Sequence, residues 1–126
     1  MSKEPCKVLV VDDDRDTANT SAMLLQMWGH EAEAAYGAED AVAKTKALDP
    51  DVILIDIVLP VMNGFDLAEE LRRWCPEAKF VALTGFTRAD IVRRSREAGF
   101  SKVLIKPAPA AALKEAVETE CATAVK

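Results

Sequence analysis

Five side chains that follow apolar runs have the types that metal binding and phosphoryl transfer require. Asp12 and Asp13 follow one apolar run, and Asp56 follows another. Thr84 and Lys106 come directly after two further runs. Carboxylates with no histidine or thiol among them suit a hard cation such as Mg²⁺ and not zinc. With the cation bound, one carboxylate could attack an electrophilic phosphorus, and the hydroxyl and the ammonium could contact the phosphoryl oxygens.

The apolar runs that precede these side chains predict the strands of a parallel sheet. VLVV, VILI and FVAL are apolar at every position, which is typical of strands covered on both faces. The run VLI is a shorter version, and one weaker strand pattern lies between the first two runs. The predicted strands are 7–11, 31–35, 52–55, 79–83 and 102–105.

The stretches between the predicted strands have helical patterns. Asp14 or Asp16 can cap the first helix, and Gly29 supplies its stop. The predicted helices run from residue 14 or 16 to 28, and over 37–48, 63–74, 87–98 and 109–122. The chain therefore alternates strand and helix five times.

This alternation predicts an α/β fold, an open doubly wound sheet of five parallel strands with right-handed crossovers. The expected strand order is 2-1-3-4-5, with a ligand crevice at the carboxyl ends of strands 1 and 3. Those ends carry the three carboxylates, and the next two strands lead to Thr84 and Lys106. We therefore expect all five side chains on one rim of a single domain over residues 1–126.

Composition and charge argue against several other classes of protein. A chain of 126 residues, 50% hydrophobic and 29% charged, has the size and balance of one globular domain. A net charge of −5 argues against direct nucleic-acid binding, which needs a basic face. No run approaches the roughly 18 to 20 apolar residues of a membrane span. We expect neither a nucleic acid nor a membrane among the partners.

The cysteines give no sign of a cross-link or of a zinc site. Cys6, Cys75 and Cys121 are odd in number, far apart and without CxxC spacing. We therefore expect no disulfide framework, and a reducing cytoplasm fits this usage best.

Four motifs make the chain resemble a receiver domain of the two-component response-regulator family. They are VVDDD at 10–14, DVILIDIVLPVMNGFDL at 51–67, ALTG at 82–85 and LIKP at 104–107. The motifs follow the family's order and span essentially the whole chain. The chain is similar to the single-domain chemotaxis regulators of this family, which implies a flavodoxin-like (βα)5 fold.

The resemblance implies a role for each acidic residue of the candidate site. Asp56 matches the phosphoacceptor, Asp13 a direct Mg²⁺ ligand, and Asp12 an acidic partner that holds metal-bound water. The backbone carbonyl of Val58 matches a further metal ligand.

The resemblance also assigns the residues that would respond to the phosphoryl group. Thr84 resembles the switch hydroxyl that moves toward that group, and Lys106 the ammonium that pairs with it. Pro107 corresponds to the proline that follows a cis peptide bond.

The implied function is a signalling switch and not a dedicated enzyme. A histidine kinase or a histidine phosphotransfer protein would donate the phosphoryl group to Asp56, with Mg²⁺ as cofactor. The chain would assist its own phosphorylation and dephosphorylation. No output domain follows residue 126 in this sequence, so we expect a downstream partner protein, a phosphorelay step or a phosphate sink to receive the signal.

Two positions depart from the common pattern of the family. Many receivers carry Tyr or Phe three residues before the lysine, where this chain has Val103, so we expect no aromatic ring to rotate with the switch hydroxyl. Position 58, which is often polar in the family, is Val here, and the apolar side chains of Val58 and Phe86 should flank the phosphoryl group. Such a flank is expected to hinder the water that hydrolyses the acyl phosphate.

Several alternatives stay open on the sequence. A magnesium-dependent phosphohydrolase also uses a strand-end aspartate, but it would want a second aspartate at the place of Val58. A degenerate receiver that only docks would not need the intact set of site residues. Asp14 is interpreted as a helix cap and not as a metal ligand. The basic segment after Thr84 is interpreted as a solvated helix face, with a partner-binding face as the alternative.

Overall fold

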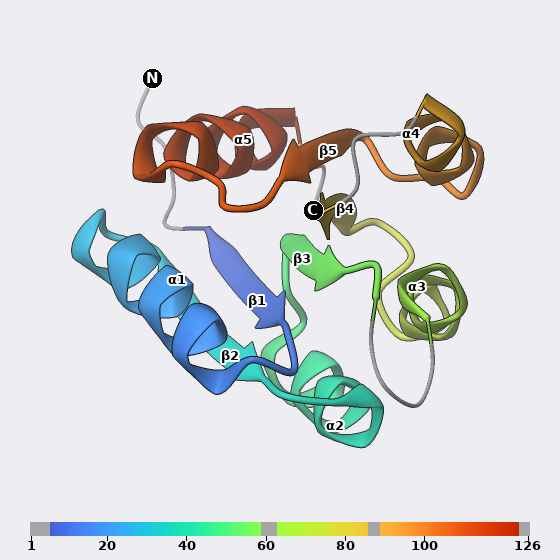
Figure 1. The fold of residues 1–126 in the computed structure, drawn as a ribbon. Helices are drawn as coiled ribbons and strands as arrows, with labels where there is room; N and C mark the ends of the chain where they lie inside the picture. The colour runs from blue at the N-terminus through green and yellow to red at the C-terminus, as the bar shows by residue number, and fades with distance from the viewer. Residues whose placement is uncertain (1–5, 59–62, 86–88, 124–126) are drawn as a thin grey trace.

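The computed structural model describes residues 6–58, 63–85 and 89–123 of the chain. Within these ranges, strands and helices alternate throughout (Figure 1). The elements are β1 (Lys7–Val11), α1 (Arg15–Met27), β2 (Glu31–Ala35), α2 (Ala38–Leu48), β3 (Val52–Asp56), α3 (Gly64–Arg72), β4 (Lys79–Thr84), α4 (Ala89–Glu97), β5 (Lys102–Ile105) and α5 (Ala110–Thr123). The strands form one parallel sheet in the order β2-β1-β3-β4-β5, which confirms the predicted fold.

The observed element bounds differ slightly from the predicted ones. β3 and β4 each continue one residue further than predicted, so Asp56 and Thr84 are the last residues of their strands. The register pairs Asp56 with Leu83 of β4 and pairs Thr84 with a residue of β5. Both site residues therefore have backbones held by the sheet. The predicted start of the fourth helix lies at residues outside the described ranges, and α4 is described from Ala89 onward.

Helices cover both faces of the sheet (Figure 1). α1 and α5 lie on one face, and α2, α3 and α4 lie on the other. Val8 and Val10 of β1 pack in the apolar core on the α1 and α5 face, while Leu9 and Val11 pack in the core on the opposite face. Because both faces are buried, the strand is apolar from Val8 to Val11. In the part of the chain that the structure describes, no helix is long and apolar enough to cross a membrane.

Asp14 caps α1 and fixes the turn that follows β1. Its Oδ1 accepts from the backbone N–H of Asp16 at 3.1 Å, and its Oδ2 accepts from the Thr17 hydroxyl at 2.9 Å. The hydrogen bond from Thr17 is the main cause that lowers the pKa of Asp14. These contacts confirm the interpretation of Asp14 as a helix cap.

Gly64 allows α3 to begin directly against the end of β3. Its N–H donates to the carbonyl of Ile57 at 2.8 Å. A Cβ atom at this position would lie 2.7 Å from the carbonyl oxygen of Asp56 and 2.7 Å from Cα of Ile57. Both atoms belong to the backbone, so no side-chain rotation relieves the contact. The close approach of the α3 backbone to the backbone of Asp56 and Ile57 therefore requires glycine at position 64.

Substitution of Gly64 by alanine is expected to destabilise the fold by about 1 to 3 kcal/mol, because the backbone after Asp56 must move. Urea denaturation of both proteins measures this difference in the free energy of unfolding. Gly37→Ala is the matched control, since a Cβ there meets no atom within 4 Å and its φ is −169°. Equal stability of the Gly64→Ala protein and the wild type would contradict the close approach.

The structure corrects the expectation for the cysteines. Cys6 and Cys121 form a disulfide, with Cα atoms 6.0 Å apart and a sequence separation of 115. Cys6 directly precedes β1, and Cys121 lies in α5, which packs on the same face of the sheet. The packing of α5 therefore brings together two cysteines whose spacing predicted no pairing. Cys75 is a buried thiol that donates to the carbonyl of Leu71 at 3.3 Å.

Candidate functional site

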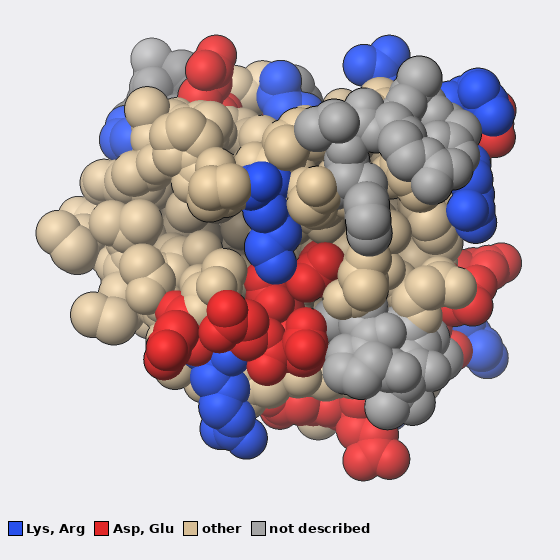
Figure 2. Space-filling model, in the orientation of Figure 1, with Lys and Arg blue, Asp and Glu red and all other residues tan. Residues whose placement is uncertain are grey.

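An acidic cluster lies at the carboxyl ends of β1 and β3. Asp12, Asp13 and Asp56 each offer one carboxylate oxygen, and these oxygens lie within 4.8 Å of one another. The register that pairs Val11 with Ile55 brings the next residues of the two strands side by side. In Figure 2, acidic side chains gather near the centre of the visible face, beside a basic side chain.

Lys106 joins the two buried carboxylates of the cluster. Its Nζ donates to Oδ2 of Asp12 at 3.0 Å and to Oδ2 of Asp56 at 3.1 Å. The backbone N–H of Lys106 donates to the carbonyl of Thr84 at 2.8 Å, which anchors the start of the loop into α5. The peptide bond between Lys106 and Pro107 is cis, as the sequence predicted.

The carboxylate of Asp56 is held in a buried and highly charged setting. Burial, together with the charge of Asp12, raises the pKa of Asp56. The N–H of Val58, which donates to Oδ1 of Asp56 at 3.0 Å, and the ammonium of Lys106 oppose this rise. The site therefore holds more negative charge than one lysine offsets, and a cation would relieve it.

The pKa of Lys106 is raised as well. Burial acts to lower the pKa of its ammonium, but the hydrogen bonds to Asp12 and Asp56 outweigh that effect. The ammonium therefore stays charged where the phosphoryl oxygens are expected. Its charge and its two donated hydrogen bonds make it suited to bind an anion that attaches to Asp56.

The donor set of the cluster fits Mg²⁺. Asp12 is fully buried, Asp56 is 6% exposed, and Asp13 is exposed, so one ligand faces solvent and could admit the ion with its waters. Oδ1 of Asp12 accepts from the N–H of Asp14 at 3.0 Å, and its Oδ2 accepts from Lys106. Each oxygen of an ionised carboxylate can accept more than one partner, so the oxygens keep capacity for a hard cation.

The other predicted residues lie around this cluster. Thr84 ends β4 with no solvent exposure, next to β3 in the sheet. The peptide N–H of Val58 contacts Asp56, and its side chain is 53% exposed. Val103 is partly buried, pairs with Ala82 of β4 and packs against the core on the α3 and α4 face. Phe86 lies outside the described residues.

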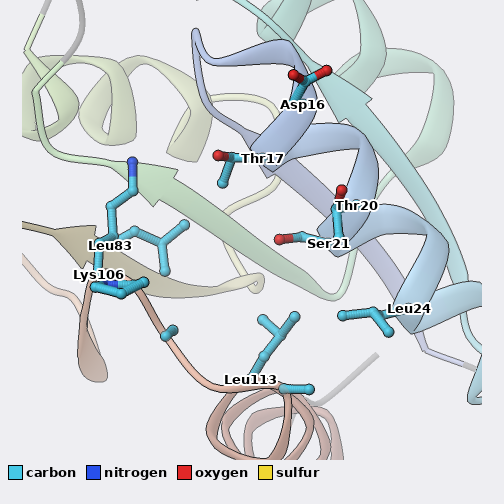
Figure 3. Close-up of a pocket in the computed structure, with 11 residues that line it drawn as sticks. Asp16, Thr17, Thr20, Ser21, Leu24, Leu83, Lys106 and Leu113 are labelled. Carbon is cyan, nitrogen blue, oxygen red and sulfur yellow. The ribbon is translucent and has the colours of Figure 1, made fainter.

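A cavity of about 560 Å³ adjoins the cluster, and the sequence did not predict it (Figure 3). It lies between α1, the end of β4 and the first turn of α5. Its walls include the hydroxyl side chains Thr17, Thr20 and Ser21 and the apolar side chains Leu24, Leu83 and Leu113. Lys106 lines this cavity while its ammonium contacts the carboxylates. The cavity contains none of the clustered carboxylates, so it is separate from the candidate metal site.

The sequence model of the response regulator receiver domain family matches residues 8–118. The chemotaxis protein CheY of Thermotoga maritima is 31% identical over 102 residues, which cover 80% of this chain and 85% of that protein. A response regulator receiver protein of Anaeromyxobacter sp. is 35% identical over 101 residues, or 80% of this chain. The chain spans only 42% of that relative and 25% of the transcriptional regulatory protein ZraR of Salmonella typhimurium.

Solved structures of similar proteins have the same fold. A CheY-like response regulator receiver domain protein from Methanospirillum hungatei superposes with a TM-score of 0.87 at 28% sequence identity. The alignment covers 95% of this chain and 96% of that one. The chemotaxis protein CheY4 of Vibrio cholerae gives a TM-score of 0.85 at 28% identity, covering 92% of this chain and 98% of that one.

Proposed function

This chain belongs to the response regulator receiver domain family, and we propose that it accepts a phosphoryl group on Asp56 in a Mg²⁺-dependent reaction. One observation carries the proposal. The Asp56 carboxylate lies in a cluster with Asp12 and Asp13, and the ammonium of Lys106 donates to it at 3.1 Å. The four side chains combine a nucleophile, hard metal ligands and a fixed positive charge at one strand end.

In the proposed reaction, a carboxylate oxygen of Asp56 attacks the phosphorus of a phosphohistidine. An oxygen–phosphorus bond forms, the phosphorus–nitrogen bond breaks, and the leaving imidazole takes up a proton. Mg²⁺ would supply positive charge to the phosphoryl oxygens, with Asp13, Asp56 and the Val58 carbonyl as its proposed ligands and Asp12 holding metal-bound water. Lys106 gives up a hydrogen bond to the carboxylates and donates to the new phosphoryl group.

The product is an acyl phosphate, and its formation changes the protein's conformation. The Thr84 hydroxyl is proposed to donate to the phosphoryl group and so to favour a second conformation around β4 and β5. A downstream protein responds only as far as it binds the two conformations differently. The chain would assist both its phosphorylation and its dephosphorylation, and the apolar side chain of Val58 would slow access of the hydrolytic water.

The proposed donor is a histidine kinase or a histidine phosphotransfer protein, in the cytoplasm. One relative in which a similar segment occurs is the autoinducer 1 sensor kinase/phosphatase LuxN of Vibrio campbellii, 38% identical over 78 residues. That segment is 9% of the relative, so the likeness concerns the receiver alone. The net charge of −5 supports a protein as output and not direct contact with nucleic acid. A phosphohydrolase is disfavoured because the Val58 side chain offers no proton.

The metal dependence is tested by replacing one ligand. Asp13→Ala is expected to weaken Mg²⁺ binding at least about tenfold, because the cluster loses its exposed charged oxygen. Isothermal titration with MgCl₂ measures the change, and removal of Mg²⁺ by EDTA should stop phosphorylation of the wild type by acetyl phosphate.

Asp14→Ala is the matched control for the metal site. It removes the neighbouring carboxylate, which caps α1 and lies outside the cluster. We expect unchanged Mg²⁺ affinity and a small loss of stability, because α1 loses its cap. An Asp13→Ala protein that binds Mg²⁺ like the wild type would refute the proposed ligand set.

A further inference from the structure

The disulfide connects the residue just before β1 to the end of a helix. Cys6 is fully buried; its carbonyl accepts from the N–H of Glu31 at 2.9 Å, and its N–H donates to Nδ1 of His30 at 3.4 Å. Cys121 lies in the last turns of α5, whose other end follows the loop that carries Lys106. The disulfide therefore holds the end of α5 that lies far along the helix from the candidate site.

The two cysteine residues differ in their exposure to solvent. Cys6 has no exposed surface, whereas Cys121 is partly exposed. Cys75 is 3% exposed and donates to a backbone carbonyl, so it is shielded from reagents. Among the three cysteines, Cys121 is thus the most exposed residue and the first point of attack for an external thiol or disulfide.

Other contacts hold α5 in place without the disulfide. Leu113 and Val117 are 5% and 0% exposed in the core shared with α1. Glu118 accepts from Lys114 at 3.1 Å and lies 3.3 Å from Nε2 of His30. Breaking the disulfide should therefore leave the domain folded. It would release only the constraint on the last turns of α5.

We propose that Cys6 and Cys121 are a reversible redox site whose reaction partner is a low-molecular-weight disulfide of the glutathione type. The Cys121 thiolate attacks one sulfur of that disulfide and releases one thiol. The Cys6 thiolate then attacks the mixed disulfide at Cys121 and releases the second thiol. Two electrons pass from the cysteines to the small disulfide, and the two cysteine protons end on the thiols released. The reverse reaction needs two thiols of the same class.

The consequence of oxidation is a cross-link over nearly the whole chain. A disulfide that joins residues 115 positions apart restricts the unfolded chain strongly, while the folded state already holds the two Cα atoms 6.0 Å apart. The redox state should therefore change the stability of the domain and the freedom of α5. This inference concerns a site remote from Asp56 and does not depend on the proposed phosphorylation.

The test equilibrates the purified protein with mixtures of reduced and oxidised glutathione. Acid quenching, alkylation of thiols and peptide mass spectrometry give the fraction with Cys6 linked to Cys121. We expect that fraction to rise with the proportion of oxidised glutathione and to fall again when reduced glutathione is added. The oxidised protein should melt roughly 10 °C higher than the reduced protein.

Two variants separate this site from other effects. Cys121→Ser should abolish the difference in Tm between oxidised and reduced samples, whereas Cys75→Ser should keep it. Comparing the two redox states of each variant cancels any cost of the substitution itself. The proposal is overturned if no mixture links Cys6 to Cys121, or if Cys121→Ser keeps the difference. It is equally overturned if native protein, once oxidised, resists reduction by the thiol.

Discussion

Asp56→Asn is expected to abolish phosphorylation by acetyl phosphate, with a loss of at least roughly a thousandfold in rate, because an amide cannot replace the carboxylate nucleophile. The asparagine oxygen can still accept from the N–H of Val58 or from Lys106, so the local structure should persist. Intact-protein mass spectrometry measures the addition of one phosphoryl group to the wild type in the presence of Mg²⁺. The adduct should be stable in acid and labile in base, as an acyl phosphate is.

Asp14→Asn supplies the control for this experiment. Its carboxylate is close in sequence and exposed, but it binds the first turn of α1 and lies outside the cluster. It should be phosphorylated like the wild type. Urea denaturation should show that the Asp56→Asn protein is folded, since burial raises the pKa of Asp56 and the substitution removes a poorly solvated charge. Undiminished labelling of Asp56→Asn would assign the acceptor to another residue.

The fold was predictable from two kinds of signal in the sequence, apolar strand patterns and the helical patterns between them. The runs that became β1, β3 and β4 are apolar on both alternating faces, and helical patterns separate them. Parallel pairing then places every strand's carboxyl end on the same rim, so Asp12, Asp56 and Lys106 were expected along one edge of the sheet. The placement of these side chains on one rim therefore followed from the sequence pattern, while the strand order was expected as the commonest one for a fold of this size.

The contacts within the site did not follow from the pattern. The hydrogen bonds of Lys106 to both Asp12 and Asp56 depend on the path of the loop after β5, which residue types do not specify. The need for glycine at position 64 comes from the backbone of Ile57, which approaches it through tertiary packing. Sequence spacing carries no information on such distances.

The disulfide was missed for a related reason. The odd number and wide spacing of the cysteines argue against a disulfide framework, but these signals apply to small secreted proteins with many disulfides. Here a single pair forms because α5 returns along the sheet and ends beside the start of β1. The relevant signal would have been the placement of Cys6 just before the first strand and of Cys121 near the end of the last helix.

Thr84→Ala is expected to permit phosphorylation but to weaken the conformational response. Thr84 ends β4 with no exposed surface, beside β3 and its Asp56. A hydroxyl that donates to a charged group contributes about 1.5 to 3 kcal/mol. Its loss should shift the equilibrium away from the activated conformation roughly 10-fold to 100-fold. Chemical-shift changes on addition of beryllofluoride, an analogue of the phosphoryl group, measure the response, and Thr84→Ser should retain it.

Val103→Ala is the contrasting variant, and its expected effect is on stability. Val103 fills part of the core on the α3 and α4 face, so its truncation should cost about 1 kcal/mol in the free energy of unfolding, at the low end for a partly buried site. Valine has no aromatic ring that must rotate inward. Thr84 can therefore approach a phosphorylated Asp56 without such a rotation. The beryllofluoride response should therefore survive in Val103→Ala. A folded Val103→Ala protein that takes up phosphate normally but gives no activated-state shifts would show that residue 103 transmits the signal after all.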